Sequence, residues 1–345
     1  MKKLMLLFAL LLWNVSFGEP PYDYSKIDEH ARNTPEKYAE SVEKLAAYLT
    51  KPAKNDYEKV RSFFVWLSDN IAYDVDLFRR YKPGTSLQIG PEDVLKQGKA
   101  VCQGYADLFN ALCEEAGIES RMIPGYSRGF GNRDRKDFST ADHAWNSVFI
   151  EGQWYLLDAT WGAGGLDEKM NYKAEFNEKY FLATPEEFVL DHMPLQPMWQ
   201  LLDCPVSIKA FAAGDEAIRQ KIAEKSKCVS FQEKINEYDA MLPADRELNA
   251  AEDAYLFNPD NHLVMARGYM DYAHHIMSGI KRQMSSREEI EQAVGAQEEA
   301  LAYLKKAQQV LAKVKSGAEM EKDFVSKNIK NSEDNLRSMK AVLKN

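Results

Sequence analysis

Residues 142–162 read DHAWNSVFIEGQWYLLDATWG and carry the clearest fold signal of the chain. Two apolar, aromatic-rich runs, 144–150 and 153–159, are separated only by Glu151 and Gly152. A two-residue connection that contains glycine is typical of a tight β-hairpin. Both faces of the two runs are largely apolar, which predicts a hairpin that lies inside a sheet and is covered on each side.

The hairpin brings two chemically important residues to one face. In the register set by the two-residue turn, Trp145 opposes Asp158 and His143 opposes Thr160. His143 and Asp158 are then diagonal neighbours, with backbones about 5 to 8 Å apart. At that separation the imidazole and the carboxylate can form a hydrogen bond, which would fix the tautomer of the ring and stabilise its protonated form.

A helix with a cysteine at its start is predicted upstream, where residues 98–118 read GKAVCQGYADLFNALCEEAGI. Apolar residues recur at helical spacing over 102–116, and Gly117 is a typical C-terminal stop. Cys102 would lie at the helix N-terminus, where unpaired backbone amides stabilise a thiolate and lower the pKa of the thiol. Cys113 lies in the middle of the same helix on its core side, and we interpret it as a packing residue.

Cys102, His143 and Asp158 together form a candidate catalytic triad. A nucleophile, a base and a carboxylate that orients the base are the components of nucleophilic catalysis. Each residue alone has a simpler interpretation, since a helix cysteine is more often a small buried apolar residue and a strand-end aspartate is usually a turn residue. The same three side chains could also bind zinc. The chain has no paired short ligand spacing such as CxxC, however, so we predict no metal and no cofactor.

Three sequence motifs resemble the transglutaminase-like superfamily, and most of all its kyphoscoliosis-peptidase branch. They are VWLSDNIAYD at 65–74 and the two strings quoted above, and the resemblance covers roughly residues 55–200. It implies a papain-like α+β fold in which Cys102 is the nucleophile, His143 the general base and acid, and Asp158 the orienting carboxylate. The implied reaction is acyl transfer through a thioester, which passes to water in a peptidase and to a lysine amine in a transglutaminase.

Four further side chains are candidates for the cleft. The backbone amide of Cys102 is one natural donor to a reaction oxyanion. Tyr73, in the first of the three motifs, and Gln88 are candidates for the second donor, and a structural role is the simpler interpretation of each. Trp145 and Trp161 are candidates for the walls of the cleft, with core packing as the alternative.

Residues 1–18 have the features of a secretory signal peptide. Two lysines precede an apolar run over 4–13, and Ser16 and Gly18 occupy the small-residue positions before a cleavage point. The apolar run is too short to cross a bilayer, and no later segment approaches the necessary length. We therefore expect a protein without a transmembrane segment that is secreted or periplasmic in a bacterium.

A change in composition near residue 204 predicts two domains after the signal peptide. Residues 19–204 carry an excess of acidic side chains and would form the α+β catalytic domain, with helices packed on an antiparallel sheet. Residues 205–345 are close to neutral and have helical periodicity almost throughout, which predicts an all-α domain. This second domain weakly resembles tetratricopeptide helix pairs but has no clean repeat period, so an irregular helical bundle is the alternative.

The chain has four cysteines, and two of them straddle the predicted domain boundary. In an oxidising compartment Cys204 and Cys228 could close a short loop as a disulfide, or they could remain two buried thiols. Cys102 and Cys113 share one helix face but lie about three turns apart, too far to be bridged.

Composition narrows the classes of function. The 345 residues are 45% apolar and 28% charged, as in ordinary folded proteins. A net charge of −9, with no basic cluster, argues against nucleic-acid binding. We expect a secreted cysteine-dependent acyl-transfer enzyme with a protein or peptide substrate. Hydrolysis is the favoured reaction, and crosslinking is the alternative. A non-catalytic envelope adaptor, which would use the helical domain to bind a protein partner, is the alternative from another class.

Overall fold

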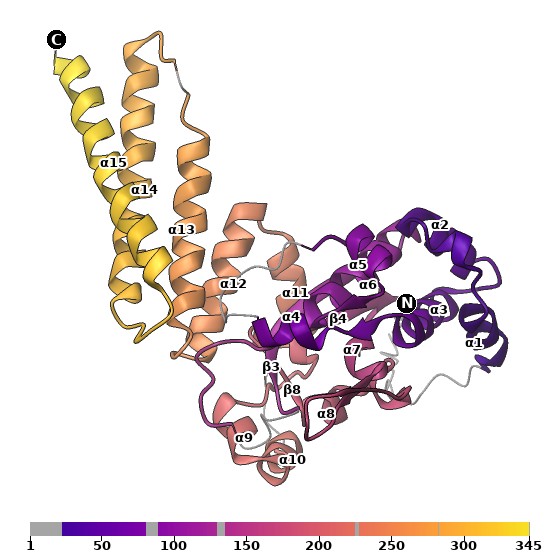
Figure 1. The fold of residues 1–345 in the computed structure, drawn as a ribbon. Coiled ribbons are helices and arrows are strands. Elements are labelled where there is room, and N and C mark those ends of the chain that lie inside the picture. Colours follow the sequence, from indigo (N-terminus) through magenta and orange to yellow (C-terminus); the bar gives the residue numbers. More distant parts are fainter. Residues whose placement is uncertain (1–22, 81–88, 130–134, 225–227, 282, 345) are drawn as a thin grey trace, which may run out of the picture.

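The computed structural model describes residues 23–80, 89–129, 135–224, 228–281 and 283–344. An α+β body holds most of the chain, and long helices from the C-terminal part stand away from this body (Figure 1). The mixed α+β fold class predicted from the sequence is therefore confirmed. The predicted signal peptide, residues 1–18, lies outside the described residues.

One long buried helix organises the N-terminal half. The elements of this half are α1 (Ser25–Arg32), η1 (Glu36–Tyr38), α2 (Val42–Leu49), α3 (Asp56–Asn70), β1 (Ala72–Tyr73), α4 (Val75–Arg80), α5 (Pro91–Gln97), β2 (Lys99–Ala100) and α6 (Cys102–Glu115). Helix α3 begins where the side chain of Asn55 accepts a hydrogen bond from the amide of Glu58, and Phe63, Phe64 and Leu67 on this helix are fully enclosed. Because α3 packs against α1, α6 and α7 (Ala159–Gly162), it fixes these helices relative to one another.

A four-stranded antiparallel sheet lies at the centre of the body, in the order β5-β4-β3-β8. Its strands are β3 (Ser120–Ser127), β4 (His143–Ile150), β5 (Gln153–Leu157) and β8 (His192–Pro194). The connection between β4 and β5 is the predicted two-residue turn, since Ile150 pairs with Gln153. Both Glu151 and Gly152 in this turn have positive φ angles, as the tightest hairpin turns require.

The hairpin is less internal than predicted. Strand β4 lies between β5 and β3, and Asn146 donates a hydrogen bond to the backbone of α6 at 3.0 Å. Strand β5 is an edge strand, extended only by an isolated bridge between Leu156 and Ala183. Trp154, Leu156 and Leu157 of this strand are buried all the same, and Trp154 packs edge-on against Trp199. The apolar pattern of β5 thus reflects cover by other side chains and not a further long strand.

Short elements that the sequence analysis did not predict follow the hairpin. They are α7, β6 (Gly164–Leu166), β7 (Tyr172–Ala174), η2 (Glu178–Tyr180), α8 (Pro185–Phe188), β8 and η3 (Pro197–Gln200). β6 and β7 form a separate two-stranded ribbon, whereas β8 joins the main sheet by pairing His192 with Ser127. A three-residue strand that ends in proline is too short to show a period of two.

The hairpin pairing also ends earlier than predicted, at the pair of Asn146 with Leu157. The two pairs expected beyond it, Trp145 with Asp158 and His143 with Thr160, are wrong. Oδ1 of Asp158 instead accepts hydrogen bonds from the backbone amides of Thr160 at 2.8 Å and Trp161 at 3.1 Å. This cap turns the chain out of the sheet and into α7.

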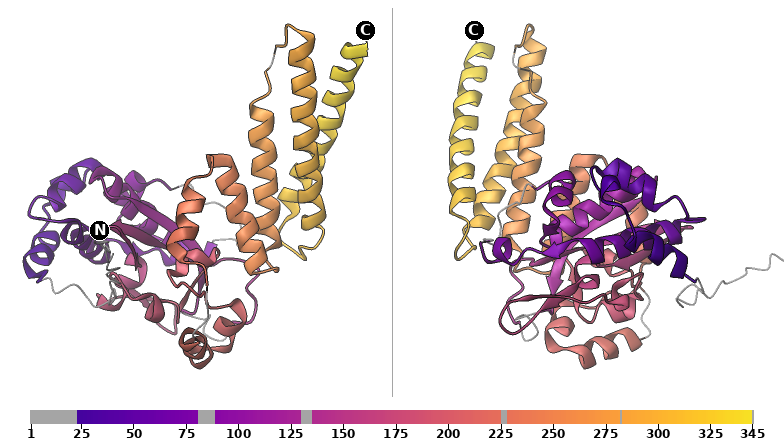
Figure 2. Two further views of the ribbon diagram at one scale, coloured as in Figure 1. Left: turned by 180° about the vertical axis from the view of Figure 1, so that it is seen from behind. Right: turned by 45° about the vertical axis from the view of Figure 1, so that its right-hand side comes forward.

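The C-terminal part is helical, as predicted. Its helices are α9 (Ile208–Ala213), α10 (Asp215–Ala223), α11 (Phe231–Asp239), α12 (Pro243–Phe257), α13 (His262–Ser278), α14 (Arg287–Leu311) and α15 (Glu319–Lys344). Helices α13, α14 and α15 stand together, away from the body, in both views of Figure 2. Fully buried alanines on these helices, among them Ala266, Ala300 and Ala307, permit their close packing. Among the described residues, no helix is both long and apolar enough to cross a membrane. The tetratricopeptide resemblance stays a prediction.

Residues on the two sides of position 204 share one apolar cluster. Tyr126 of β3 and Met193 of β8 belong to the same buried group as Phe211 of α9 and Ile218 of α10. Helices α9 and α10 therefore extend the core of the sheet, while α13 to α15 have buried clusters of their own. The division of the chain at residue 204 stays a prediction.

The turn between α12 and α13 docks on the sheet. Nδ2 of Asn258 donates hydrogen bonds to the Tyr126 hydroxyl at 2.8 Å and to the backbone oxygen of Phe138 at 2.7 Å. The Tyr126 hydroxyl in turn donates to Asn261. Both asparagines are buried, so this polar contact is fixed inside the protein and joins the C-terminal helices to strand β3.

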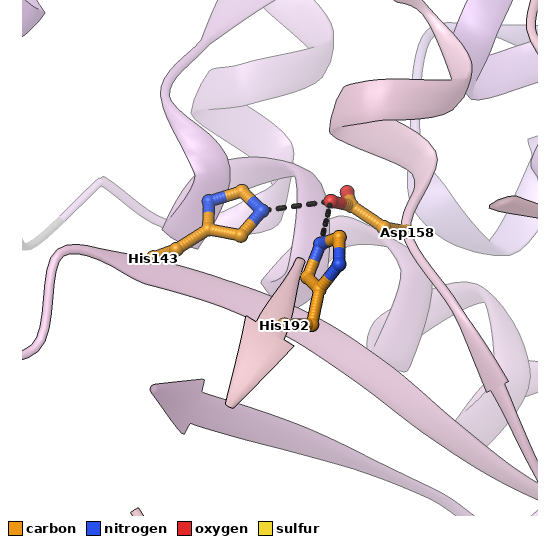
Figure 3. A group of neighbouring side chains, drawn as sticks. All are labelled: His143, Asp158 and His192. Carbon is orange, nitrogen blue, oxygen red and sulfur yellow. Dashed lines mark hydrogen bonds and ion pairs between the residues drawn. The ribbon is translucent and has the colours of Figure 1, made fainter. Parts of the chain in front are cut away.

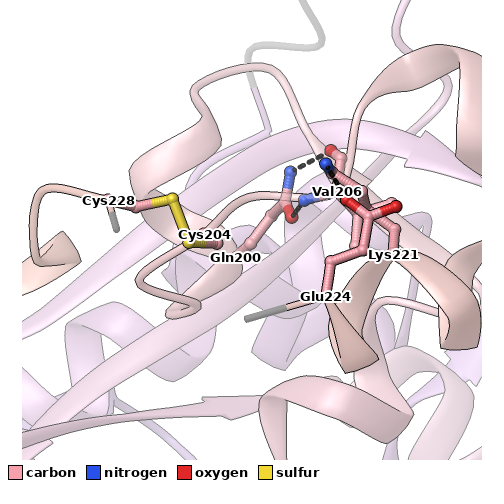
Figure 4. Close-up of a disulfide and its surroundings, with 6 residues drawn as sticks. All are labelled: Gln200, Cys204, Val206, Lys221, Glu224 and Cys228. Atoms are coloured by element: carbon pink, nitrogen blue, oxygen red, sulfur yellow. Dashed lines mark hydrogen bonds and ion pairs between the residues drawn. A yellow bond between two sulfur atoms is a disulfide. The ribbon is translucent and has the colours of Figure 1, made fainter. Parts of the chain in front are cut away.

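A disulfide joins Cys204 to Cys228 and encloses α9 and α10 (Figure 4). Of the two alternatives for these cysteines, the structure has the paired one. Beside the disulfide, the buried side chain of Gln200 forms two hydrogen bonds with the backbone of Val206, at 2.9 and 2.7 Å. The segment that enters α9 is thus fixed at two neighbouring positions.

Candidate active site

Cys102 is the first residue of α6, as the sequence predicted. The parallel pair of β1 and β2 leads the chain into this helix, with Tyr73 opposite Ala100. Cys102 is partly exposed, whereas Cys113 on the same helix is fully buried. Burial raises the pKa of the Cys113 thiol, which keeps that thiol protonated. Cys102 is therefore the accessible thiol of α6.

His143 and Asp158 form a buried hydrogen-bonded pair. Nε2 of His143 lies 2.7 Å from Oδ2 of Asp158. Cys102 lies near enough to the His143 ring to raise the pKa of this histidine. Because Nε2 of His143 faces Asp158, Nδ1 is the ring nitrogen that remains for a proton exchange with the thiol. The fold thus brings together the three residues that the sequence singled out, although they come from α6, β4 and the start of α7.

Burial and neighbouring charges shift the pKa values of His143 and Asp158 in opposite directions. Burial lowers the pKa of His143, but the carboxylate of Asp158 and the neighbouring Cys102 raise it more, so the net pKa lies well above its usual value. Burial raises the pKa of Asp158, but His143 and His192 lower it more, so the net pKa lies well below its usual value. At neutral pH the imidazole and the carboxylate therefore form an ion pair.

Asp158 accepts hydrogen bonds from four donors. Its Oδ1 binds the two amides at the start of α7, and its Oδ2 binds His143 and also Nε2 of His192 at 3.0 Å. Figure 3 shows the two histidine rings, from β4 and β8, approaching the same carboxylate. With donors at both oxygens the carboxylate is held ionised and in one orientation.

His192 is the functional candidate that the sequence analysis missed. Its side chain is almost fully enclosed, and its ring stacks on Phe188 with 4.1 Å between the ring centroids. Its second ring nitrogen, Nδ1, lies 2.7 Å from Oδ1 of Asp191. A single histidine in a three-residue strand has no sequence pattern around it. Only the pairing of β8 with β3 places this ring next to Asp158.

A cavity of about 1040 Å³ lies beside His143. His143, Tyr73 and Trp161 line it, together with residues of the β6–β7 ribbon. Trp145 lies behind His143 instead, 1% exposed, with 6.0 Å between the two ring centroids. Trp145 therefore supports the imidazole from within the core. Gln88, the other candidate donor, lies outside the described residues.

Tyr73 is placed where a hydrogen-bond donor could serve the reaction. Burial, with the charges of Cys102 and Asp158, raises the pKa of the Tyr73 hydroxyl far above its usual value. The hydroxyl therefore keeps its proton and remains a donor beside the cavity. Its role as an oxyanion donor stays a prediction.

The residue types of His143, Asp158 and His192 could also hold a metal ion, and their polar atoms lie within 4.8 Å of one another. The contacts that join them, however, are hydrogen bonds of 2.7 and 3.0 Å to the same oxygen. Ligands that surround zinc tetrahedrally at about 2.1 Å would lie about 3.4 Å apart, farther than either contact. The arrangement fits a hydrogen-bonded network better than a metal site.

Comparison with known families agrees with this geometry. Residues 43–159 match the family model of the transglutaminase-like superfamily. This segment is a transglutaminase-like domain. It contains Cys102, His143 and Asp158, whereas His192 and its partner Asp191 lie beyond its end.

Relatives of the transglutaminase-like domain occur in animals. Kyphoscoliosis peptidase of Mus musculus is 38% identical over 190 residues, which cover 54% of this chain and 28% of the mouse protein. Hillarin of Drosophila melanogaster is 28% identical over 210 residues, or 55% of this chain and 24% of the fly protein. The chain thus matches less than a third of the length of these relatives. A solved structure described as a candidate cysteine protease from Cytophaga hutchinsonii has 27% identity and a TM-score of 0.28, over 41% of this chain and 43% of that one.

Proposed function

We propose that this protein is a secreted, cysteine-dependent acyl-transfer enzyme that acts on amide bonds of proteins or peptides, chiefly by hydrolysis. The observation that carries the proposal is an imidazole that binds a buried carboxylate and lies near a partly exposed thiol. His143 binds Asp158 at 2.7 Å, lies near enough to Cys102 for this residue to raise its pKa, and lines a cavity of about 1040 Å³.

The first half of the reaction uses the three residues in separate roles. The ionised Asp158 favours a protonated His143, and a protonated ring next to Cys102 favours the thiolate. The thiolate sulfur attacks the carbonyl carbon of the amide, and the backbone amide of Cys102 donates a hydrogen bond to the oxyanion that forms. His143 then gives its proton to the amide nitrogen, and the C–N bond breaks. The amine departs, and the acyl group remains on Cys102 as a thioester.

The second half depends on the acceptor. His143, now neutral, takes a proton from water while the water oxygen attacks the thioester carbon. The C–S bond then breaks, which releases a carboxylic acid and restores the thiolate–imidazolium pair. A lysine amine in place of water would give a crosslink. The peptidase name of the 38% identical mouse relative supports hydrolysis as the main outcome for this chain.

Two observations support secretion. The first 18 residues have the pattern of a signal peptide. The disulfide between Cys204 and Cys228 supports an oxidising compartment, because such bonds persist in secreted and periplasmic proteins and are rare in the cytosol.

The proposal is tested with casein as substrate and three versions of the full chain, namely wild type, Cys102→Ala and Cys113→Ala. Mass spectrometry counts new peptide N-termini, and a biotinylated primary amine reports crosslinking at glutamine. We expect new N-termini with wild type and Cys113→Ala and none with Cys102→Ala, because the Cys113 thiol is buried. Amine incorporation above the rate of cleavage would instead identify a crosslinking enzyme.

Alkylation of Cys102 over a range of pH separates a poor choice of substrate from an unassembled site. A thiol that reacts well below pH 7, and loses this reactivity in His143→Ala, supports the proposal even where casein is not cleaved. A thiol that titrates near its ordinary pKa of about 8.5 contradicts it and favours the adaptor alternative.

A further inference from the structure

We propose that His192 is a positioning residue of this site, held as an imidazolium between Asp158 and Asp191, and that it fixes the carboxylate that orients His143. The function of His143 in this inference rests on the function proposed above. The inference about the charge and the hydrogen bonds of His192 does not, because it follows from contacts inside the folded protein.

The two nitrogens of the His192 ring both face carboxylate oxygens. Nε2 lies 3.0 Å from Oδ2 of Asp158, and Nδ1 lies 2.7 Å from Oδ1 of Asp191. An ionised carboxylate can only accept hydrogen bonds, and a neutral imidazole carries one proton. Both contacts are therefore hydrogen bonds only when both nitrogens are protonated. A neutral ring would place a lone pair against a carboxylate oxygen inside the protein, which is costly.

Both carboxylates that face His192 have further partners that keep them ionised. Burial raises the pKa of Asp191, but His192 and Lys179 lower it more, so the net pKa is below its usual value. Lys179 lies 2.7 Å from Oδ2 of Asp191, and the Tyr180 hydroxyl donates to the same oxygen at 3.2 Å. Cationic and anionic groups thus alternate along one path, in the order His143, Asp158, His192, Asp191 and Lys179.

Aromatic side chains also surround the His192 ring. The centroid of the His192 ring lies 4.1 Å from that of Phe188, 4.4 Å from Trp161, 5.0 Å from Trp145 and 5.7 Å from Tyr180. The ring of His143, which is also titratable, lies 5.3 Å away. These walls fix the plane of the imidazole. A carboxylate of Asp158 that binds a fixed ring, a helix N-terminus and His143 at once has no freedom to rotate away from His143.

The charge of His192 is measured directly in the full chain labelled with ¹⁵N-histidine. The sequence has six histidines, so the ring signals can be assigned by single substitutions, and His192→Phe removes one of them. We expect long-range ¹H–¹⁵N correlation to give the pattern of two protonated nitrogens for His192 at pH 7. The pattern of a single ring proton would overturn the inference, whether or not the protein proves to be an enzyme.

The positioning role is tested with two variants of His192 and one matched control. His192→Phe keeps an aromatic ring against Phe188 but has no donor, and His192→Gln keeps a neutral donor for Asp158. His30→Phe is the control, because His30 also stacks on a ring, that of Tyr48 at 4.3 Å, and hydrogen-bonds through Nε2 to the backbone, but it is not part of the site. The readouts are the ¹⁵N and ¹H shifts of the His143 ring and the pH profile of Cys102 alkylation.

We expect the His143 shifts to change in His192→Phe and to stay as in wild type in His30→Phe. The alkylation rate of Cys102 at pH 6 should fall about tenfold or more in His192→Phe and should be partly restored in His192→Gln. Unchanged His143 shifts in a folded His192→Phe protein would overturn the positioning role. An inactive Cys102 in wild type, with the expected shifts of both rings, would refute the proposed enzyme and leave the His192 contacts supported.

Discussion

Asp158 binds the ring of His143 with one carboxylate oxygen and starts helix α7 with the other. Oδ2 lies 2.7 Å from Nε2 of His143, and Oδ1 accepts the amides of Thr160 and Trp161 at the helix N-terminus. One side chain therefore both holds the ring of His143 and ends the hairpin, and substitutions can separate these two contributions.

The substitution Asp158→Asn should lower the turnover of an amide substrate by about 10²-fold or more, because a neutral amide no longer stabilises the protonated imidazole. Asparagine is as good an N-cap as aspartate, whereas alanine has no cap, so Asp158→Ala should be less stable than Asp158→Asn by about 1 kcal/mol. Urea denaturation compares the two variants. Equal stability of the two, or a wild-type rate in Asp158→Asn, would show that the oxygens do not have these separate functions.

Stability should depend on pH through the same pair. The pKa of His143 is raised in the folded state. Its contribution to the unfolding free energy is therefore complete below the pKa of the unfolded chain, about 6.5, and is lost as pH rises through the pKa of the folded state. The pKa of Asp158 is lowered in the folded state. Its contribution to the unfolding free energy is therefore present above the pKa of the unfolded chain, about 3.9, and is lost as pH falls from there through the pKa of the folded state. Wild type should therefore exceed Asp158→Asn in unfolding free energy most between these two values, and less at pH 9.

Urea denaturation of both proteins from pH 4 to 9 measures this difference. Glu291→Gln, which removes only an exposed ion pair with Arg287, is the control and should differ from wild type by less than about 1 kcal/mol throughout. A difference between wild type and Asp158→Asn that is the same at pH 5.5 and pH 9 would contradict the ion pair.

Removal of the disulfide should destabilise the protein. The bond between Cys204 and Cys228 closes a loop over a sequence separation of 24, for which chain entropy predicts a loss of about 3 kcal/mol in the double variant Cys204→Ser/Cys228→Ser. Reduced wild type should match the double variant in urea denaturation. Under denaturing, non-reducing conditions a thiol reagent should find two free thiols in wild type, those of Cys102 and Cys113. A count of four would mean that the bond does not form.

Arg61 should be the ion-pair residue that matters most for stability in the N-terminal half. Its guanidinium is almost fully enclosed, binds Asp28 through two hydrogen bonds of 2.7 Å, and also pairs with Glu178. Arg61→Ala leaves the carboxylate of Asp28 without this partner, so we expect a loss of about 3 to 5 kcal/mol in thermal or urea denaturation. Arg219→Ala breaks an exposed pair with Glu187 and should cost less than about 1 kcal/mol. Similar losses in the two variants would contradict the importance of burial.

The sequence predicted the elements whose signals are local. Helix α6 begins at Cys102, where the helical spacing of apolar residues also begins, and the Glu151-Gly152 turn fixes the register of β4 against β5. The contact between His143 and Asp158 was expected for a partly wrong reason. The predicted strand pair is replaced by a helix cap, and the cap turns the Asp158 side chain toward the same ring.

The parts that were missed depend on contacts between distant segments. His192 lies 34 residues after Asp158, in a strand of three residues whose position is set by β3 and not by its own pattern. The edge position of β5 was missed because its apolar side chains are covered by Trp199 and other distant residues, which have the same effect on composition as a neighbouring strand. Local periodicity does not distinguish these two kinds of cover.

The contact of Asn258 with Tyr126 joins the projecting helices to a strand that borders the site. Tyr126 pairs with Met193, and the next pair along the same two strands is Ser127 with His192. The buried asparagines therefore contact a strand pair that is adjacent to the pair carrying His192. The attachment of the projecting helices thus lies one residue pair from the ring that contacts Asp158.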